Sequence, residues 1–450
     1  MKCFPYICPM NLAQRDRQVI WHPYTHQKVM LDPIPIIKGE GVYLIDEKGN
    51  KYIDAISSWW VNLHGHAHPY IAEKIYEQAK TLEQVIFAGF THEPAVQLAE
   101  RLLPLLPGNF SKVFYSDNGS TAVEVAIKMA LQYWRNIEES GLPLVASAKG
   151  EANTKPRDKI LALNNAYHGD TFGAMSVSER GVFTLPFHDK LFEVIFIDPV
   201  LTPNSEPACP VGRLPTTDLS TVACFIYEPL LQGAGSMKTY DAAWLEAMLE
   251  KCKEQNVICI ADEVMTGFGR TGKLFASEYC ETKPDIICLS KGLTGGTMAL
   301  GVTACTEKIY AAFVSDDKLK TFFHGHSFTA NPLACTAALA SLDLLQKTSC
   351  DQQREMISKM NSRFLAQLTT HFSLLTKNHR QLGTILAFEI DNGRDGYLNT
   401  ISSQITQLAL SKGVFLRPLG NTLYIMPPYC IKEEQLQKVY DVVEEILEES

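Results

Sequence analysis

The sequence predicts an α/β protein with a mostly parallel, helix-covered sheet and a smaller α+β unit beside it. The 450 residues, 46% of them hydrophobic, suffice for two or three domains with a substantial core. Between about residues 112 and 305, short apolar runs alternate with amphipathic stretches, which is typical of buried strands covered by helices. Polar residues gather directly after these runs, where ligands bind in open α/β sheets.

The elements follow in order along the chain. Segments 41–46 and 50–54 flank a turn and predict an antiparallel hairpin. Apolar runs predict buried strands at 112–116, 159–163, 193–197, 222–227, 257–261 and 286–290. A helical stretch from Ala334 to Gln346 opens the last part of the chain. We expect the N-terminal part (1–74) and the C-terminal part (341–450) to form a small domain beside the large one (75–340).

Composition narrows the class of ligand. With 41 Lys+Arg against 50 Asp+Glu the net charge is -9, which gives no electrostatic reason to expect nucleic acid or an anionic membrane. No apolar run reaches the length of a membrane span, and Pro5 and Pro9 interrupt the N-terminus too early for a secretory signal. The twelve cysteines include no CxxC pair and indicate free thiols in a reducing cytoplasm. Small molecules are therefore the expected ligands.

The polar residues after the strands offer three chemical functions. Gly119 and Ser120 precede an amphipathic helix whose free N–H groups and dipole could bind a phosphate, although taken alone such residues more often form an ordinary helix cap. Lys291 follows an apolar run, where desolvation would turn a lysine into an amine nucleophile. Asp262 ends another run and could pair with a protonated pyridine or form a structural ion pair. Together they meet the requirements of pyridoxal phosphate.

Longer motifs carry a resemblance to a known family. ADEVMTGFGRTG at 261–272 and LSKGLTGG at 289–296 resemble the class-III aminotransferases of fold type I. WHPYT at 21–25, SSWW at 57–60, AYHGDTFGAMS at 166–176, RPLG at 417–420 and YIMPPY at 424–429 resemble its biotin-pathway members. The resemblance runs from about residue 19 to the C-terminus. It implies a large domain with a mostly parallel seven-stranded sheet, S-adenosylmethionine as amino donor and 8-amino-7-oxononanoate as acceptor.

The resemblance also implies roles for individual residues. The implied catalytic residues are Lys291, Asp262 and Tyr167, where Lys291 holds the cofactor, Asp262 pairs with its ring nitrogen and Tyr167 stacks on its ring. The implied cofactor-binding residues are Gly119, Ser120, Tyr167, Asp262, Lys291, His326 and Ser327. The last two would come from the neighbouring subunit of a homodimer whose active sites lie at the interface. They stand where the family has Pro-Thr; Ser327 keeps the hydroxyl and His326 adds a backbone N–H.

For the substrates, the resemblance points to Tyr24, Trp59, Tyr167, Lys291, Gly325 and Arg417. Arg417 could pair with the acceptor carboxylate, while Tyr24 and Trp59 offer aromatic walls, although the Trp59–Trp60 pair could also be core. Asp170 and Arg270 are secondary candidates for shaping the donor site. Tyr424 occupies a position where many glutamate-using relatives carry arginine, which argues against glutamate as donor.

Other interpretations remain weaker. GFGRTG at 267–272 fits the GxGxxG pattern of dehydrogenases, but Asp262 and Glu263 would place negative charge beside a pyrophosphate. His64, His66 and His68 could suggest a metal, yet no acidic or cysteine cluster accompanies them, so we expect none. A binding protein on this fold would be expected to lack the lysine or the aspartate. Within the same cofactor class, the alternatives are an ω-amino acid or diamine aminotransferase and, less favoured, a decarboxylase or aminomutase.

Overall fold

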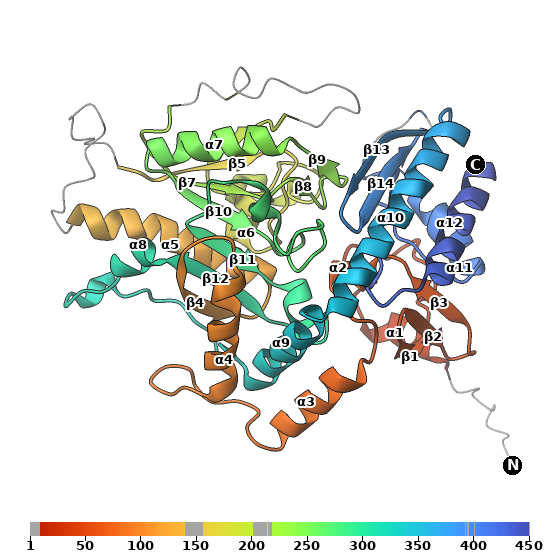
Figure 1. Cartoon of the computed structure of the whole chain (residues 1–450), viewed down its shortest axis with the longest axis horizontal. Coiled ribbons are helices and arrows are strands. Elements are labelled where there is room, and N and C mark those ends of the chain that lie inside the picture. Colours follow the sequence, from red (N-terminus) through yellow and green to blue (C-terminus); the bar gives the residue numbers. More distant parts are fainter. Residues whose placement is uncertain are drawn as a thin grey trace, which may run out of the picture.

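A computed structural model describes residues 10–139, 156–200, 214, 218–391, 393, 396–399 and 401–449. A seven-stranded sheet forms the centre of the larger part of the molecule (Figure 1). Its strands, in spatial order, are β4 (Phe110–Ser116), β12 (Gly301–Thr306), β11 (Ile286–Leu289), β10 (Ile258–Asp262), β7 (Val222–Tyr227), β5 (Lys159–Leu163) and β6 (Ile195–Ile197). Only β12 runs antiparallel to its neighbours, so six strands end at the same edge.

Helices cover both faces of this sheet, as continuous apolar strands require. Along β10, Ile258 and Ile260 belong to the core under helix α5 (Gly119–Glu139), while Cys259 and Ala261 belong to the core of α7 (Ala242–Glu254). This alternation follows from the two-residue period of a strand. α4 (Glu93–Leu102) contributes to the same core as α7, and α9 (Pro332–Leu345) packs against α3 (Pro69–Ala79) and α4.

The smaller part contains two sheets built from both ends of the chain. One has the order β1 (Ile36–Glu40), β2 (Tyr43–Asp46), β3 (Lys51–Asp54) and β15 (Val414–Phe415), and the other has β13 (Thr376–Leu382), β14 (Ile385–Ile390) and β16 (Thr422–Ile425). The helices packed beside them are α10 (Thr348–His371), α11 (Ile401–Ser411) and α12 (Glu433–Glu448). Because β15 pairs with β3, the two ends of the chain share one sheet. The predicted domain boundaries at 74/75 and 340/341 stay predictions.

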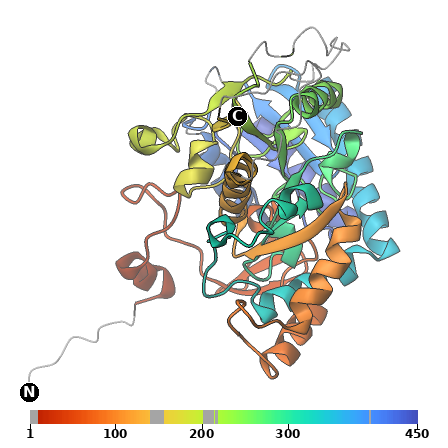
Figure 2. The same ribbon diagram turned by 90° about the vertical axis from the view of Figure 1, so that its left-hand side faces the viewer.

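The remaining elements are short. They are α1 (Leu12–Val19), α2 (Ser57–Trp60), α6 (Phe172–Ser176), α8 (Glu307–Ala311), the hairpin β8 (Leu231–Gln232) and β9 (Lys238–Thr239), and the 3-10 turns η1 (Leu103–Leu105), η2 (Leu185–Lys190), η4 (Ala276–Tyr279), η5 (Lys291–Thr294) and η6 (Lys318–Lys320). Helix α1, capped by Asn11, stands away from the body of the molecule (Figure 2).

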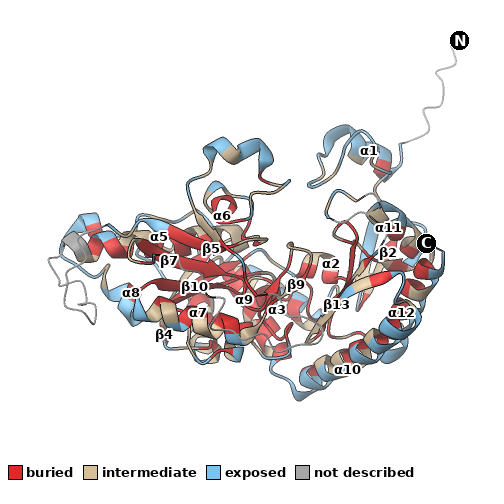
Figure 3. Cartoon of the chain, turned by 90° about the horizontal axis from the view of Figure 1, so that it is seen from above, coloured by how far each residue is buried: buried red, intermediate tan, exposed pale blue. Residues whose placement is uncertain are grey.

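The predicted strands and hairpin agree with the structure, with ends that differ by at most two residues. The pattern does not single out β12, because its six residues include a glycine, two threonines and an alanine rather than a long aliphatic run. Buried residues concentrate along β5, β7 and β10 (Figure 3). No helix in the described ranges is long and apolar enough to cross a membrane.

Candidate active site

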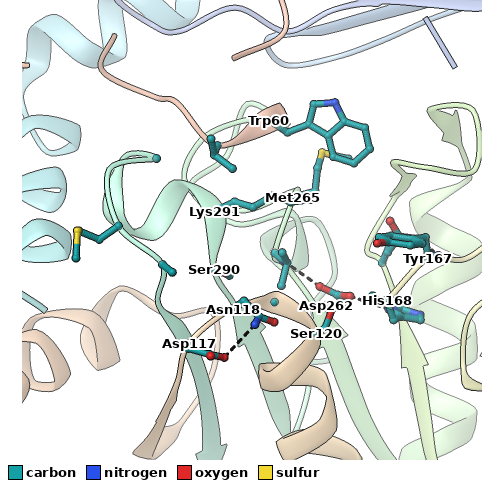
Figure 4. A pocket seen from close by; sticks show the side chains of 18 of the residues that line it. Trp60, Asp117, Asn118, Ser120, Tyr167, His168, Asp262, Met265, Ser290 and Lys291 are labelled. Atoms are coloured by element: carbon teal, nitrogen blue, oxygen red, sulfur yellow. Dashed lines mark hydrogen bonds and ion pairs between the residues drawn. The ribbon is translucent and has the colours of Figure 1, made fainter. Parts of the chain in front are cut away.

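A cavity of about 460 Å³ lies at the edge where β4, β5, β7, β10 and β11 end (Figure 4). Its walls come from all five strand ends and from the turn after β3, which brings in Trp60. The lining residues are Trp60, Val61, Asp117, Asn118, Gly119, Ser120, Tyr167, His168, Gly169, Glu228, Asp262, Val264, Met265, Ser290, Lys291, Gly296, Thr297, Met298 and Ala299. The predicted residues Gly119, Ser120, Tyr167, Asp262 and Lys291 therefore meet at one cavity.

Lys291 lies where β11 ends and begins the turn η5, with its backbone in the left-handed region at φ 44°. The surrounding protein desolvates its amine and lowers the pKa of Lys291 to about 8, against the opposing influence of Asp262 and Glu228. Its Nζ lies 4.5 Å from the centroid of the Trp60 ring, which covers it from the side of the smaller part. Because the ring is far less polar than water, it contributes to that desolvation.

Asp262 is the last residue of β10, and its carboxylate is hydrogen-bonded to the side chain of His168. Nδ1–H of His168 donates to Oδ2 of Asp262 at 2.7 Å, and the backbone N–H of Val264 donates to Oδ1 at 3.1 Å. His168 is buried, and its Nε2 has no hydrogen-bond partner among the described residues. A carboxylate can accept further hydrogen bonds, so Asp262 retains capacity for a cationic N–H group in the cavity.

Glu228, which directly follows β7, is a buried carboxyl group to which we assigned no role from the sequence. Its two oxygens accept hydrogen bonds from the backbone N–H groups of Tyr167 and Gly233, each at 3.0 Å. Desolvation raises the pKa of Glu228 to about 7, and nearby His168 works in the opposite direction. Its position could have indicated a role, because Glu228 follows a fully apolar strand in the same way that Asp262 ends one.

The start of helix α5 also lines the cavity. Neither the N–H of Gly119 nor that of Ser120 has an acceptor among the described residues. A Cβ added at Gly119 would lie 2.7 Å from Cγ1 of Val264, and one at Gly169 would lie 2.0 Å from Oγ of Ser120. Side chains there would crowd a narrow cradle with free donors at the positive end of a helix, which suits a phosphate.

These features fit pyridoxal phosphate. The cavity offers an amine for the aldehyde at Lys291, a carboxylate for the ring nitrogen at Asp262 and a donor-lined cradle for the phosphate at Gly119 and Ser120. Tyr167 stands at its side as an aromatic wall.

A second group of predicted residues gathers beside the cavity. The guanidinium of Arg417 lies 4.6 Å from the Trp59 ring centroid, and the Tyr24 and Trp59 rings meet edge to face at 5.4 Å. The hydroxyls of Tyr24 and Tyr167 both donate to Oδ2 of Asp170, at 2.5 and 3.0 Å. Since Tyr167 also lines the cavity, this cluster is continuous with it.

Gly325, His326 and Ser327 do not line the cavity in this single chain. They belong to the segment 323–328, in which the backbone carbonyl of Ser327 accepts a hydrogen bond from Gln84 Nε2 at 2.5 Å. The prediction that a neighbouring subunit supplies these residues stays a prediction.

The weaker sequence signals have structural roles. Nε2 of His64 lies 3.1 Å from Oγ of Ser341, and Nε2 of His66 lies 2.9 Å from Oδ2 of Asp54. The described residues contain no group of three or more His, Cys, Asp or Glu placed to hold a metal. Arg270, within GFGRTG, is buried and donates to the carbonyls of Asn62 and Pro427.

Comparisons with known proteins identify the family. The model of the class-III aminotransferases matches residues 24–447. The chain is 45% identical over 437 residues to an adenosylmethionine-8-amino-7-oxononanoate aminotransferase of Synechococcus elongatus, covering 96% of this chain and 98% of the relative. A solved enzyme of that name from Methanocaldococcus jannaschii has TM-score 0.87 and 35% identity, covering 98% and 99%.

A further solved structure is an amine transaminase from an uncultivated Pseudomonas species in its PLP-bound form. It has TM-score 0.83 and 28% identity, and the match covers 96% of this chain and 98% of that one. With the strand-end lysine and aspartate at one cavity, the chain belongs to the class-III aminotransferases and is a pyridoxal-phosphate-dependent transaminase.

Proposed function

We propose that this chain transfers the amino group of S-adenosylmethionine to 8-amino-7-oxononanoate in biotin biosynthesis. Two relatives named for this aminotransferase, one known from its sequence and one from a solved structure, match at least 96% of the chain and support the proposal. The observation that carries it is the position of Arg417. Its guanidinium lies on the Trp59 ring and makes no ion pair with a described residue. An unpaired cation on an aromatic wall suits an aliphatic substrate that ends in a carboxylate.

The residues of the cavity would hold the cofactor as follows. Lys291 Nζ would bind its aldehyde, Asp262 its ring nitrogen, and Gly119 with Ser120 its phosphate. Tyr167 would lie against the ring. Pyridoxal phosphate, when bound, supplies an aldehyde that captures amines and a protonated ring that withdraws electrons from the reacting carbon.

Lys291 is the group that moves the proton. Because its surroundings lower the pKa of its amine to about 8, a part of the Nζ groups is unprotonated at neutral pH. A neutral amine can accept the proton of the substrate carbon at Nζ and return it elsewhere, which is general acid-base catalysis. Trp60, 4.5 Å from Nζ, keeps bulk water from that side of the amine.

Asp262 and His168 would act as a pair that holds the ring nitrogen of the cofactor. His168 donates to one oxygen of Asp262 and leaves that carboxylate fixed toward the cavity. A fixed negative charge favours a proton on a ring nitrogen placed against it. Glu228, bound to the N–H of Tyr167 and of Gly233, fixes the turn that carries Tyr167 beside the ring.

The substrates would lie between the two groups of residues. Arg417 would bind the carboxylate of the acceptor, and Trp59 with Tyr24 would line its aliphatic chain. Tyr167 would lie between this cluster and Lys291, since its hydroxyl is 3.3 Å from that of Tyr24. Asp170, which accepts from both tyrosines, would offer negative charge toward a sulfonium donor.

We also propose a homodimer in which each subunit completes the site of the other. Phe323 and Phe328, 73% and 63% exposed, flank the segment that contains Gly325, His326 and Ser327. Ile86 and Phe90 add 62% and 64% exposed apolar side chains on the loop that touches Ser327 through Gln84. Exposed apolar residues that cluster in this way mark protein interfaces. A second copy would cover them and bring His326 and Ser327 to the phosphate.

The expected location is the cytoplasm. All nine cysteines within the described residues are free, and eight of them are buried. Free thiols persist where the environment keeps them reduced, which supports this location.

The test follows the absorbance of the bound cofactor during each half-reaction. S-adenosylmethionine should convert the cofactor to its amino form, and 8-amino-7-oxononanoate should restore it. Glutamate, ω-amino acids and diamines serve as matched donors. Conversion by an ω-amino acid or diamine but not by S-adenosylmethionine would favour the alternative, an amine transaminase such as the Pseudomonas relative.

A further inference from the structure

The turn that carries both tryptophans, residues 57–60, is strained. Ser57, Ser58 and Trp60 have φ angles of 53°, 59° and 69°, in the left-handed region that side chains with a Cβ rarely adopt. No glycine relieves this conformation, so other contacts must impose it. Such strain concentrates at functional sites, and here the turn places Trp59 beside Arg417 and Trp60 beside Lys291.

Hydrogen bonds from Ile56, Ser58 and His66 converge on Asp54, the last residue of β3. Its Oδ1 accepts from the N–H of Ile56 at 3.2 Å, and its Oδ2 accepts from Oγ of Ser58 at 2.9 Å. Nε2 of His66 donates to the same Oδ2 at 2.9 Å. Asp54 is completely buried and does not line the cavity. Its carboxylate therefore accepts its side-chain hydrogen bonds from the turn, and from the segment that follows it through His66.

The rest of the turn is tied to the C-terminal sheet. Oγ of Ser57 donates to the carbonyl of Met426 at 2.8 Å, and the N–H of Met426 donates to the carbonyl of Ala55, also at 2.8 Å. Trp60 meets the ring of Tyr424 edge to face at 6.1 Å. These bonds fix the ends of the turn, and within it the side chain of Ser58 is bonded to Asp54 alone among the described residues.

We propose that Asp54 is a positioning residue of the reaction. Its carboxylate holds the turn 57–60 in its strained conformation and so places Trp59 against the substrate and Trp60 over the Lys291 amine. This inference rests on the proposed function for the identity of the substrates, but the placement of the rings does not depend on it. Asp54 acts through the two tryptophans and touches neither Lys291 nor Arg417.

The chain offers a matched control for this role. Asp46, at the end of the neighbouring strand β2, is also buried and accepts four hydrogen bonds, from the N–H groups of Lys48 and Asn50, the side-chain amide of Asn50 and the hydroxyl of Tyr52. It closes the β2–β3 turn and lies outside the cavity and outside the tryptophan turn. Asp46→Asn should therefore lose stability in the same way without moving the tryptophans.

The experiment compares Asp54→Asn with Asp46→Asn in the cofactor-loaded enzyme. Asp54→Asn leaves one acceptor oxygen where the carboxylate has two, so an NH2 must face either the N–H of Ile56 or the donors Ser58 and His66, and the turn should relax. We expect the tryptophan band of the near-ultraviolet circular dichroism to change and the half-saturating concentrations of both substrates to rise about tenfold. The maximal rates should fall less. In the apoenzyme the pKa of Lys291 should rise, because a displaced Trp60 admits water. Asp46→Asn should change none of these quantities, although its melting temperature falls.

Ser58→Ala gives a milder version, since it removes one bond and leaves Asp54 paired with His66 and Ile56. It should shift the tryptophan dichroism, the half-saturating concentrations and the pKa of Lys291 in the same direction by a smaller factor. It replaces Asp54→Asn in the test if that variant does not fold. A drop in melting temperature in Asp54→Asn and Ser58→Ala with unchanged tryptophan dichroism and unchanged half-saturation would overturn the proposal. If instead the unmodified enzyme rejects S-adenosylmethionine, the proposed function fails, while the dichroism and the apoenzyme titration still decide the role of Asp54.

Discussion

The Lys291 cavity and the cluster of Tyr24, Trp59 and Arg417 are assembled in different ways. The reactive groups of the cavity stand at the ends of paired strands, so the hydrogen-bond register of one sheet fixes them. The cluster joins side chains from the N-terminal and C-terminal parts of the chain, which contact one another through their rings and the guanidinium. These three side chains are half-buried or exposed. Under the proposed function, the catalytic groups lie on one sheet, and the substrate-selecting groups lie where separate segments of the chain meet. Substitutions in the cavity should affect every substrate, and substitutions in the cluster should discriminate among them.

The largest effect is expected from Lys291→Ala. The variant should fold and bind pyridoxal phosphate weakly, but turnover should fall by more than about four orders of magnitude, because the amine that binds the cofactor and the base that moves the proton are lost together. Steady-state rates and cofactor absorbance measure both. Lys112→Ala, on exposed surface of β4, is the control and should keep full activity. Full activity in Lys291→Ala would remove the assignment of the site.

Asp262→Asn should have the next largest effect. The neutral amide no longer stabilises a protonated ring nitrogen, so we expect both half-reactions to slow by roughly three orders of magnitude while some cofactor remains bound. Asp285→Asn is a matched control, because Asp285 is also buried but lies at the other end of the sheet, where it pairs with Lys253 at 2.8 Å. Near-normal rates in Asp262→Asn would mean that another group holds the nitrogen.

Arg417→Ala should separate the two substrates. The bound acceptor would bury its pair with the half-buried Arg417, and truncation of one partner of a buried charge-assisted pair costs about 2–5 kcal/mol, so the acceptor half-reaction should weaken by roughly two to three orders of magnitude. The donor half-reaction should lose less, because S-adenosylmethionine differs in shape and carries a positive sulfonium. Single-turnover measurements of each half-reaction give the comparison.

Arg417→Lys sharpens this result. It keeps the positive charge but not the planar, bidentate geometry of guanidinium, so an intermediate loss on the acceptor side is expected. Equal losses in both half-reactions would show that Arg417 supports the fold or a carboxylate site shared by the two substrates, and the acceptor assignment would be wrong.

The same contrast explains what the sequence could predict. Strand ends are marked by continuous apolar runs that stop at a polar residue, so Lys291 and Asp262 stand out and their meeting at one cavity follows from the parallel sheet. Glu228 likewise is the polar residue at which the apolar run of β7 stops. Its role was missed because its partners are backbone N–H groups of Tyr167 and Gly233, which no side-chain pattern encodes.

The tryptophan pair illustrates the limit of such reasoning. The sequence predicts Trp59 for the substrate, whereas the ring against Lys291 belongs to Trp60. Neighbouring side chains in a strand or helix have predictable directions, but the turn 57–60, with positive φ at three of its four residues, follows neither period. Likewise, Tyr24 and Tyr167 are 143 residues apart, and only the folded chain brings their hydroxyls to 3.3 Å.

The smallest expected effect is a shift in pH dependence that separates the two regions. The apoenzyme should capture pyridoxal phosphate through neutral Lys291, whose pKa is about 8, so the capture rate should rise about tenfold per pH unit below that value and level off above it. The negative charge of Asp262 raises the pKa of Lys291, so Asp262→Asn should move the midpoint to lower pH. Arg417→Ala should leave it in place, because the charged groups that act on this amine are Asp262, Glu228 and Arg270. Stopped-flow absorbance from pH 6 to 10 measures the midpoint; a shift in Arg417→Ala equal to that in Asp262→Asn would show that the two regions are one electrostatic unit.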